Sequence, residues 1–188
     1  MSFQDSGELV ILGGAKGTGK TTLAQQLCSE TGMTYIHPGS WFIKYWNKEH
    51  PLETEKRIVD EILQLRSPLI DIHYASYVKG LEGIAEGYVQ GLCDSSIKQL
   101  AERYSPVVLY LVEVDASTLM QRRLCDNKRR KLELTIIEEE LSQNRKGWEH
   151  FRELMSSCTE VKPETIANYE IEVSLAKIIQ GCSAGRIL

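Results

Sequence analysis

The sequence predicts an α/β domain in which helices cover both faces of a mostly parallel β-sheet. Short apolar runs alternate with helical, amphipathic stretches about five times along the 188 residues, and this alternation is typical of strands joined by helical crossovers. The apolar runs are nearly continuous, which indicates strands buried on both faces. Right-handed crossovers then place helices on both sides of the sheet. Because no internal repeat, low-complexity tract or linker interrupts the pattern, we expect one domain over residues 1–188.

The predicted strands are the short apolar runs of the sequence. The first reads ELVIL and the longest reads PVVLYLVEV, whereas ETIAN near the carboxyl end is the weakest candidate. In chain order the predicted strands are 8–12, 33–36, 68–72, 106–114 and 164–168.

The predicted helices lie between these strands, and several carry a capping signal. Apolar residues recur at helical spacing in 52–65. Asp94 or Ser95 can cap the next helix, Asp115 can cap the one after it, and Thr135 with Glu138 forms a capping box. The expected helices are 21–29, 52–65, 95–104, 116–125, 136–155 and 171–179, and we expect the tail 181–188 to fray.

The composition is typical of a soluble globular protein, with 42% hydrophobic and 26% charged residues. The net charge of −4 argues against a protein that coats nucleic acid, although a local basic patch remains open. The 5 cysteines are scattered without a C-x-x-C pair, which argues against a disulfide framework or zinc knuckle. No apolar run is long enough to span a membrane and no signal peptide is recognisable, so we expect a cytoplasmic location.

The stretch GGAKGTGKTT follows the first predicted strand, and residues 14–21 match the phosphate-binding pattern G-x-x-x-x-G-K-[ST]. The glycines let the loop curl so that backbone N–H groups face an anion, and the helix that follows adds its positive end. Lys20 can reach the β- and γ-phosphates of a nucleotide, and the Thr21 hydroxyl can bind Mg²⁺. The predicted nucleotide-binding residues of this loop are Gly14, Ala15, Lys16, Gly17, Thr18, Gly19, Lys20, Thr21 and Thr22.

A site of this kind also needs a carboxylate at the end of a neighbouring strand, to bind the metal or its waters. Asp71 in PLIDIH is the best candidate, because an ionised Asp in an apolar strand is costly without a partner. Asp115 is the runner-up and is better explained as a helix cap. His73 shares a strand face with Asp71, and either a structural or a catalytic role is open. The segments NKRR and DIHY lack the N-K-x-D and D-x-x-G patterns of GTPases.

A basic segment, RRLCDNKRRK, runs from Arg122 to Lys131 between two predicted helices. Arginines in a mobile segment can neutralise the charge that migrates during phosphoryl transfer. The alternatives are a solvated basic loop, an RNA contact, or pairing with acidic neighbours such as those at 138–140. The arginines placed for a catalytic role are Arg122, Arg123, Arg129, Arg130 and Arg145.

The segments that carry a family resemblance are the amino-terminal P-loop, MTYIHPGSWF, IDIHYA and VDASTLMQRRLCDNKRRKLE. Over about residues 8–180, the chain resembles the archaeal-type adenylate kinases and their P-loop relatives. The resemblance implies a P-loop NTPase three-layer sandwich whose five parallel strands have the order 2-3-1-4-5. It also implies an acceptor-binding region at about 37–66 and 74–92, and a short lid at about 122–134. Arg130 and Arg145 match lid arginines, Arg122 or Arg123 matches the arginine before the lid, and Asn168 matches a turn near the adenine.

The chain departs from the pattern of this group in its acceptor region. Many of these kinases carry an arginine shortly after the turn that matches Gly39–Ser40, where this chain has only Lys44, and another after the third strand, where it has only Lys79. The aromatic residues of SWFIKYW fit either a base-stacking surface or the core. The glycine-rich run 79–92 is expected to be a loop, because four glycines would cost about 3–4 kcal/mol inside a helix.

These observations favour an ATP-dependent phosphotransferase that uses Mg²⁺, with a nucleoside monophosphate, AMP first, as the small-molecule acceptor. An ATPase or nucleotide-gated assembly factor, and a kinase for a non-nucleotide hydroxyl, are the alternatives. A membrane partner is not expected and nucleic acid is a less favoured one. The predicted metal ligands are Thr21 and Asp71. The predicted catalytic residues are Lys20, Asp71, Arg122, Arg123, Arg130 and Arg145, and Asn168 joins the loop residues as a nucleotide-binding residue.

Overall fold

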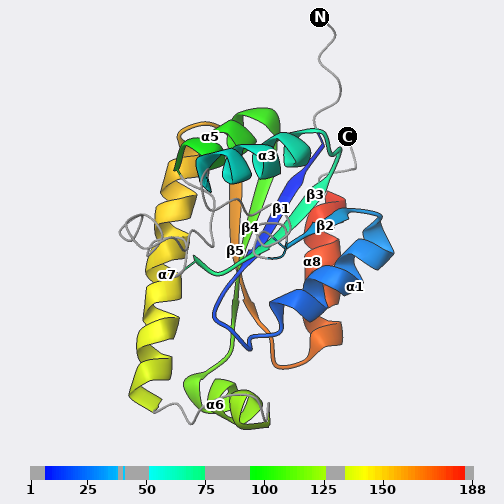
Figure 1. Cartoon of the computed structure of the whole chain (residues 1–188). Helices are drawn as coiled ribbons and strands as arrows, with labels where there is room; N and C mark the ends of the chain where they lie inside the picture. The colour runs from blue at the N-terminus through cyan, green and yellow to red at the C-terminus, as the bar shows by residue number, and fades with distance from the viewer. Residues whose placement is uncertain (1–6, 38–39, 41–50, 75–93, 126–133, 185–188) are drawn as a thin grey trace, which may run out of the picture.

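The computed structural model describes residues 7–37, 40, 51–74, 94–125 and 134–184 (Figure 1). The elements follow the predicted alternation of strands and helices. In chain order they are β1 (Leu9–Gly13), α1 (Lys20–Thr31), β2 (Thr34–Ile36), α3 (Pro51–Leu63), β3 (Pro68–Ile72), α5 (Asp94–Arg103), β4 (Val107–Glu113), α6 (Ala116–Cys125), α7 (Leu134–Ser156), β5 (Val161–Ala167) and α8 (Ile171–Ala184).

The five strands form one parallel sheet with the order β2-β3-β1-β4-β5, which confirms the predicted fold class and strand order. In the register of the central strand β1, Leu12 lies beside Asp71 of β3 and Tyr110 of β4. All strands of a parallel sheet end at the same edge. The loop after β1, the end of β3 and the turn after β5 therefore share one edge, where open α/β folds bind their ligands.

Alternating residues of β1 divide the core into two layers, as the near-continuous apolar strands predicted. Leu9 and Ile11 pack in a cluster with residues of α3, α5 and α7 on one face. Val10 and Leu12 pack in a second cluster with residues of α1 and α8 on the other face. Figure 1 shows the same arrangement, with α1 and α8 on the side of the sheet opposite α7.

Tyr74 joins the sheet to α7 just beyond the end of β3. Its ring is fully buried, meets Phe151 edge-to-face at 5.6 Å between centroids, and its hydroxyl donates to the Tyr110 carbonyl at 3.1 Å. Two glycines make room for it. A Cβ on Gly13 would lie 1.9 Å from the Tyr74 ring, and a Cβ on Gly147 would lie 2.5 Å from the Tyr74 carbonyl oxygen.

The largest differences from the predicted elements concern the carboxyl-terminal third. The predicted strand 164–168 is three residues too late, because β5 begins at Val161 and includes Pro163. Only Ile166 of this outermost strand is fully buried, which explains its weak sequence signal. The expected fraying from 181 is wrong for Gly181 to Ala184, which continue α8. In addition, α7 begins at Leu134, so Thr135 lies inside the helix and not at its N-cap.

Candidate active site

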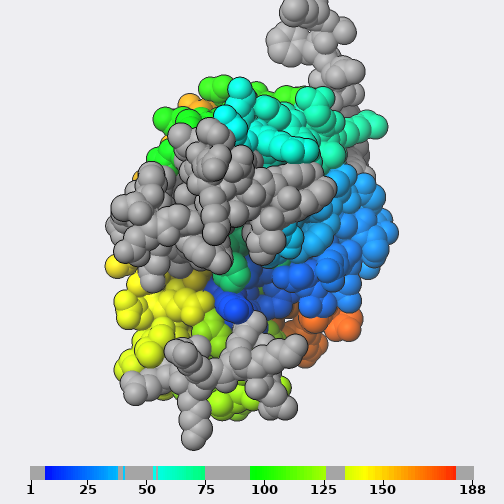
Figure 2. Space-filling model, viewed as in Figure 1, coloured from blue at the N-terminus to red at the C-terminus, as the bar shows by residue number. Residues whose placement is uncertain are grey.

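The loop between β1 and α1 has the backbone that the phosphate-binding motif predicts. Gly17 and Gly19 have φ values of 94° and 90°, in the left-handed region that side chains rarely adopt. Gly19 is the N-cap of α1 and supplies no side-chain cap, so the N–H groups of the first helical turn remain available to an anion. In Figure 2 dark-blue atoms of this part of the chain reach the surface between α7 (yellow) and α1 (blue).

Lys20 lies inside the curl of this loop. Its Nζ donates to the Ala15 carbonyl at 3.1 Å, and Thr18 Oγ1 donates to the same oxygen at 2.9 Å. Only 4% of Lys20 is exposed. Burial lowers its pKa to about 8, although the charges of Asp71 and Glu140 oppose the shift. A buried ammonium held by a carbonyl gains from a nearby anion, so the residues present fit a bound phosphate.

The two predicted metal ligands lie together. Thr21 Oγ1 donates to Asp71 Oδ2 at 2.7 Å, and the Tyr35 hydroxyl donates to the same oxygen at 3.2 Å. Asp71 is 2% exposed, and burial together with the Asp71 charge raises the pKa of Tyr35. A hydroxyl and a carboxylate are hard oxygen donors, and Mg²⁺ bound beside phosphates takes only one or two such groups from the protein. This pair therefore fits Mg²⁺.

Asn168 lies directly behind the loop. It is fully buried, its Nδ2 donates to the Thr18 carbonyl at 2.7 Å, and its backbone N–H donates to the Glu113 carbonyl at 2.8 Å. Its Oδ1 is buried and has no hydrogen-bond partner among the residues that the structure describes. The Asn168 side chain thus supports the phosphate-binding loop from the turn after β5.

The three predicted catalytic arginines that the structure describes all bind protein groups. Arg122 donates to the Asn168 carbonyl at 2.8 Å and to the Thr18 carbonyl at 3.4 Å. Arg123 is 6% exposed, donates to the Lys16 carbonyl and forms an ion pair with Glu140. Thus Arg122 and Arg123 lie against the outside of the loop.

Arg145 forms a bidentate pair with Glu113, at 2.6 and 3.2 Å, and remains largely exposed. Arg129, Arg130 and most of the expected lid lie outside the described residues, as do Gly39, Lys44, Lys79 and the glycine-rich run 79–92.

Asp115 caps a helix, as the sequence analysis favoured, and His73 lies beyond the end of β3. Asp115 Oδ1 accepts the Thr118 N–H at 2.8 Å, and its carboxylate also binds the Ser117 and Thr118 hydroxyls, so Asp115 is the N-cap of α6. These bonds lower its pKa. Burial, and then the Lys20 charge, lower the pKa of His73 to about 3, so its imidazole is neutral at physiological pH.

Two residues of the site escaped the sequence analysis in part. Tyr35 gave no signal, because a single Tyr in a predicted strand is typical of a core position. Glu140 belonged to an acidic run, and the structure shows it as the partner of Arg123 and of the Lys16 N–H, at 2.8 and 3.2 Å.

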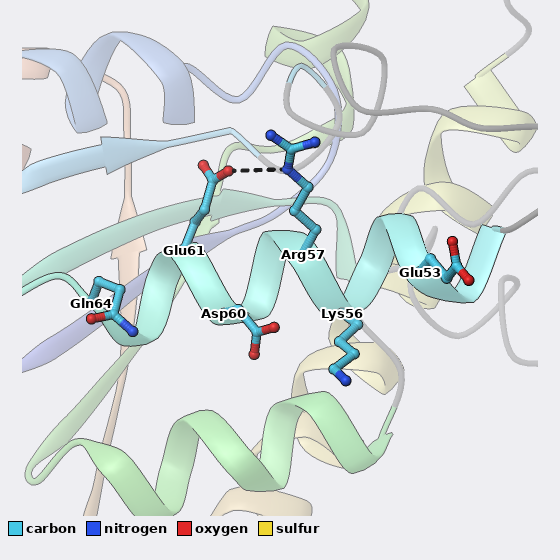
Figure 3. A pocket seen from close by; sticks show the side chains of 6 residues that line it. All are labelled: Glu53, Lys56, Arg57, Asp60, Glu61 and Gln64. Atoms are coloured by element: carbon cyan, nitrogen blue, oxygen red, sulfur yellow. Dashed lines mark hydrogen bonds and ion pairs between the residues drawn. The ribbon is translucent and has the colours of Figure 1, made fainter.

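A separate hollow lies on the outer face of α3 (Figure 3). It is far from the loop after β1, since α3 lies near the top of Figure 1 and the loop lies in the lower half. Arg57 and Glu61 form an ion pair at 3.5 Å across one helical turn there. The exposed face of α3 and the residue just after it supply the lining, and such a face is typical of solvated charges. The lining residues are Glu53, Lys56, Arg57, Asp60, Glu61 and Gln64.

Comparisons with known proteins agree with this geometry. The sequence profile of a family described as "AAA domain" matches residues 13–141, which span the loop, Asp71 and Glu140. No curated protein has a sequence significantly similar to this chain. No helix in the described part of the chain has the length and apolar character needed to cross a bilayer.

Several solved structures share the fold. The YorR protein of Bacillus subtilis, in complex with phosphorylated GDP, superposes with a TM-score of 0.65 at 17% identity, covering 95% of this chain and 97% of its own. Shikimate kinase from Acinetobacter baumannii has a TM-score of 0.53 at 16% identity, over 98% and 97% of the two chains. A gluconokinase from Sinorhizobium meliloti 1021 has a TM-score of 0.53 at 11% identity, over 96% and 94%.

Proposed function

Because the chain belongs to the AAA-domain family of P-loop proteins, we propose that it is an ATP-dependent kinase that transfers the γ-phosphoryl group of ATP to a small-molecule acceptor. The observation that carries this proposal is that an α1 amino terminus without a side-chain cap and a buried Lys20 lie beside the Thr21–Asp71 contact at 2.7 Å. These groups supply the anion cradle, the cation and the metal-binding oxygens that phosphoryl transfer requires.

The chain's own residues would divide the work. The N–H groups of residues 17–21 and the Lys20 ammonium hold the phosphates, Thr21 and Asp71 hold the metal, and Asn168 supports the loop beside the base. Mg²⁺ would neutralise charge on the phosphates. Most of the catalytic effect is positioning and charge stabilisation. The whole chain acts as one kinase domain, with an acceptor region at about 37–66 and 74–92 and a lid at about 122–134. The lid contributes Arg130, and α7, the helix that follows it, contributes Arg145.

We infer that the acceptor is a nucleoside monophosphate, with AMP as the first candidate. The resemblance of the P-loop, IDIHYA and arginine segments to archaeal-type adenylate kinases supports this choice. The YorR complex with phosphorylated GDP adds a similar fold that holds a nucleotide. The similar folds of shikimate kinase and gluconokinase favour a second candidate, a non-nucleotide hydroxyl acceptor.

An acceptor panel tests the proposal. Purified protein with Mg²⁺ and ATP is assayed for ADP alone, with each nucleoside monophosphate, and with hydroxyl acids and sugars. ADP that forms only with AMP supports the nucleotide kinase, and ADP that forms only with a hydroxyl compound supports the second candidate. ADP that forms equally without acceptor indicates an ATPase and contradicts both. The Lys20→Ala variant, folded by circular dichroism, should lose turnover in every positive arm.

A further inference from the structure

The ion pair between the buried Arg123 and the half-buried Glu140 holds one residue of the phosphate-binding loop by both of its backbone polar groups. The Lys16 N–H donates to Glu140 Oε1 at 3.2 Å. Arg123 donates to the Lys16 carbonyl twice, from Nε at 2.8 Å and from Nη2 at 2.6 Å. The same Nη2 lies 2.8 Å from Glu140 Oε1, so the two side chains form one unit on one side of the loop.

Because the peptide bond is planar, these contacts also fix which backbone groups face the opposite side of the loop. In a trans peptide the C=O and N–H groups point in opposite directions. Because the Lys16 N–H points toward Glu140, the Ala15 carbonyl must point away from it, and that carbonyl indeed binds Lys20 Nζ at 3.1 Å. Because the Lys16 carbonyl points toward Arg123, the Gly17 N–H must point to the Lys20 side as well.

Packing fixes the pair in this place. Ala15 shares a buried cluster with Leu119 of α6 and Ile137 of α7, the helices that carry Arg123 and Glu140. A Cβ added to Gly17 would lie 3.1 Å from Leu119 Cδ1 and 3.5 Å from Arg123 Cγ, so the loop rests directly on α6. Removal of Glu140 would leave the buried Arg123 without its counter-charge, and removal of Arg123 would do the same to the half-buried Glu140. Either change is costly.

We propose that Arg123 and Glu140 are positioning residues, which orient the Ala15–Lys16–Gly17 backbone so that the Gly17 N–H and the Lys20 ammonium face the bound phosphates. Arg123 then acts through the loop and does not itself touch the migrating group. This inference rests on the phosphate-binding part of the proposed function, and not on the acceptor or on transfer.

The test measures phosphate binding by the full-length chain without catalysis. Tripolyphosphate and ATP are titrated by calorimetry, and the Gly17 amide is followed by ¹H–¹⁵N NMR. In the wild type, tripolyphosphate should shift the Gly17 amide proton downfield. Arg123→Met should weaken tripolyphosphate binding about tenfold to a hundredfold, the range for one hydrogen bond to a charged group, and should remove the Gly17 shift.

Two comparisons separate positioning from a general structural role. Glu140→Gln keeps an oxygen for both the Lys16 N–H and Arg123, and should bind tripolyphosphate within about threefold of wild type, whereas Glu140→Ala should lose binding as Arg123→Met does. Arg152→Met is the matched control for Arg123→Met, because Arg152 lies on α7 with Glu140 but stacks over Trp148, with its Cζ 5.6 Å from the ring centroid. It should leave both readouts unchanged.

The inference is overturned if folded Arg123→Met binds tripolyphosphate within about twofold of wild type and keeps the Gly17 shift. If Arg123→Met does not fold, Arg123→Lys and Glu140→Ala decide by the same criteria. A wild type that does not bind tripolyphosphate also overturns it. Wild type that binds but transfers no phosphoryl group refutes the proposed kinase and leaves the inference standing. If the wild type is an active kinase and the Arg123 and Glu140 variants bind tripolyphosphate normally, the proposed kinase stands and the inference about Arg123 and Glu140 is refuted.

Discussion

The Thr21 hydroxyl donates a 2.7 Å hydrogen bond to Oδ2 of Asp71, and so joins the first turn of α1 to the end of β3. The contact brings together two residues that are far apart in the sequence. It occurs because β3 lies beside β1 in the sheet, with Asp71 opposite Leu12 in the register. The loop that begins after β1 therefore returns to the level of Asp71 when α1 starts.

The first prediction concerns the charge of Asp71. Asp71→Asn keeps an oxygen for Thr21 and Tyr35 but removes the negative charge. We expect the Mg²⁺ concentration for half-maximal activity to rise at least about tenfold, because a neutral amide binds a hard divalent cation poorly. Magnesium titrations of the steady-state rate measure this. Tyr35→Phe removes one bond to the same carboxylate and should change the requirement far less. Unchanged magnesium dependence in Asp71→Asn would remove Asp71 from the metal site.

The second prediction concerns protons taken up with the nucleotide. Burial lowers the pKa of Lys20 from 10.5 to about 8, and a bound phosphate should raise it again. Binding of ATP should therefore take up protons above pH 8, and affinity should fall as the pH rises through about 8. Calorimetry in buffers of different ionisation enthalpy measures the uptake. Lys20→Met should abolish it, whereas Lys16→Ala should preserve it, because Lys16 is held by its backbone.

The lowered pKa of Lys20 also makes the free energy of unfolding depend on pH. The folded pKa of Lys20 lies below the unfolded one, so the unfolded chain binds more protons between about pH 8 and 10.5. This group then adds stability as the pH rises through that window and has no pH-dependent effect below it. Across the window from about pH 8 to 10.5, the free energy of unfolding measured in urea should therefore rise more steeply with pH in the wild type than in Lys20→Met.

The third prediction distinguishes a catalytic role of Arg145 from its structural ion pair with Glu113. The Arg145–Glu113 pair is exposed on the arginine side, so its loss should cost no more than about 1 kcal/mol of stability. If Arg145 also neutralises charge in the transition state, Arg145→Ala should lower kcat at least about tenfold. Glu113→Ala removes the acceptor oxygens of the same pair and leaves Arg145 in place. Equal losses of kcat in both variants would mean that only the pair matters.

The fourth prediction concerns the space around Tyr74. Gly147→Ala would place a Cβ 2.5 Å from the Tyr74 carbonyl oxygen, and the backbone cannot yield cheaply. We expect a loss of about 1–3 kcal/mol in the free energy of unfolding, measured in urea. Gly32→Ala is the control. No atom lies within 4 Å of a Cβ there, and only the φ of 73° opposes the substitution, at about 1 kcal/mol. A Gly147→Ala cost no greater than the Gly32→Ala cost would contradict the packing argument.

The parallel sheet, its strand order and the loop geometry followed from local patterns and from the family resemblance. Apolar runs marked β1, β3 and β4 because these strands are buried on both faces, and the motif at 14–21 specified both the curl and the helix after it. The edge strand β5 gave a poor signal because most of its side chains are partly or fully exposed.

The partners of the arginines could not be predicted, because they depend on contacts between distant segments. Arg123 meets the Lys16 carbonyl 107 residues earlier in the chain, and Arg145 meets Glu113 across 32 residues. The basic segment 122–131 favoured anion binding for its arginines and left pairing with the acidic run at 138–140 as an alternative, and Arg123 does pair with Glu140 of that run. The structure distinguishes Arg123, which is buried against the loop, from Arg145, which is exposed beside it.

The proline in β5 has a consequence for self-association. Glu160 and Asn168 both bond to β4, so the alternate residues Val161, Pro163 and Thr165 direct their backbone groups to the outer edge of the sheet. Pro163 has no N–H to offer there, and the Thr165 carbonyl already accepts a 3.1 Å bond from Lys177 Nζ of α8. A strand from a second molecule that docked against this edge would lack the N–H donor of residue 163 and would meet a Thr165 carbonyl that is already hydrogen-bonded. The sheet resists extension into a larger intermolecular assembly at β5.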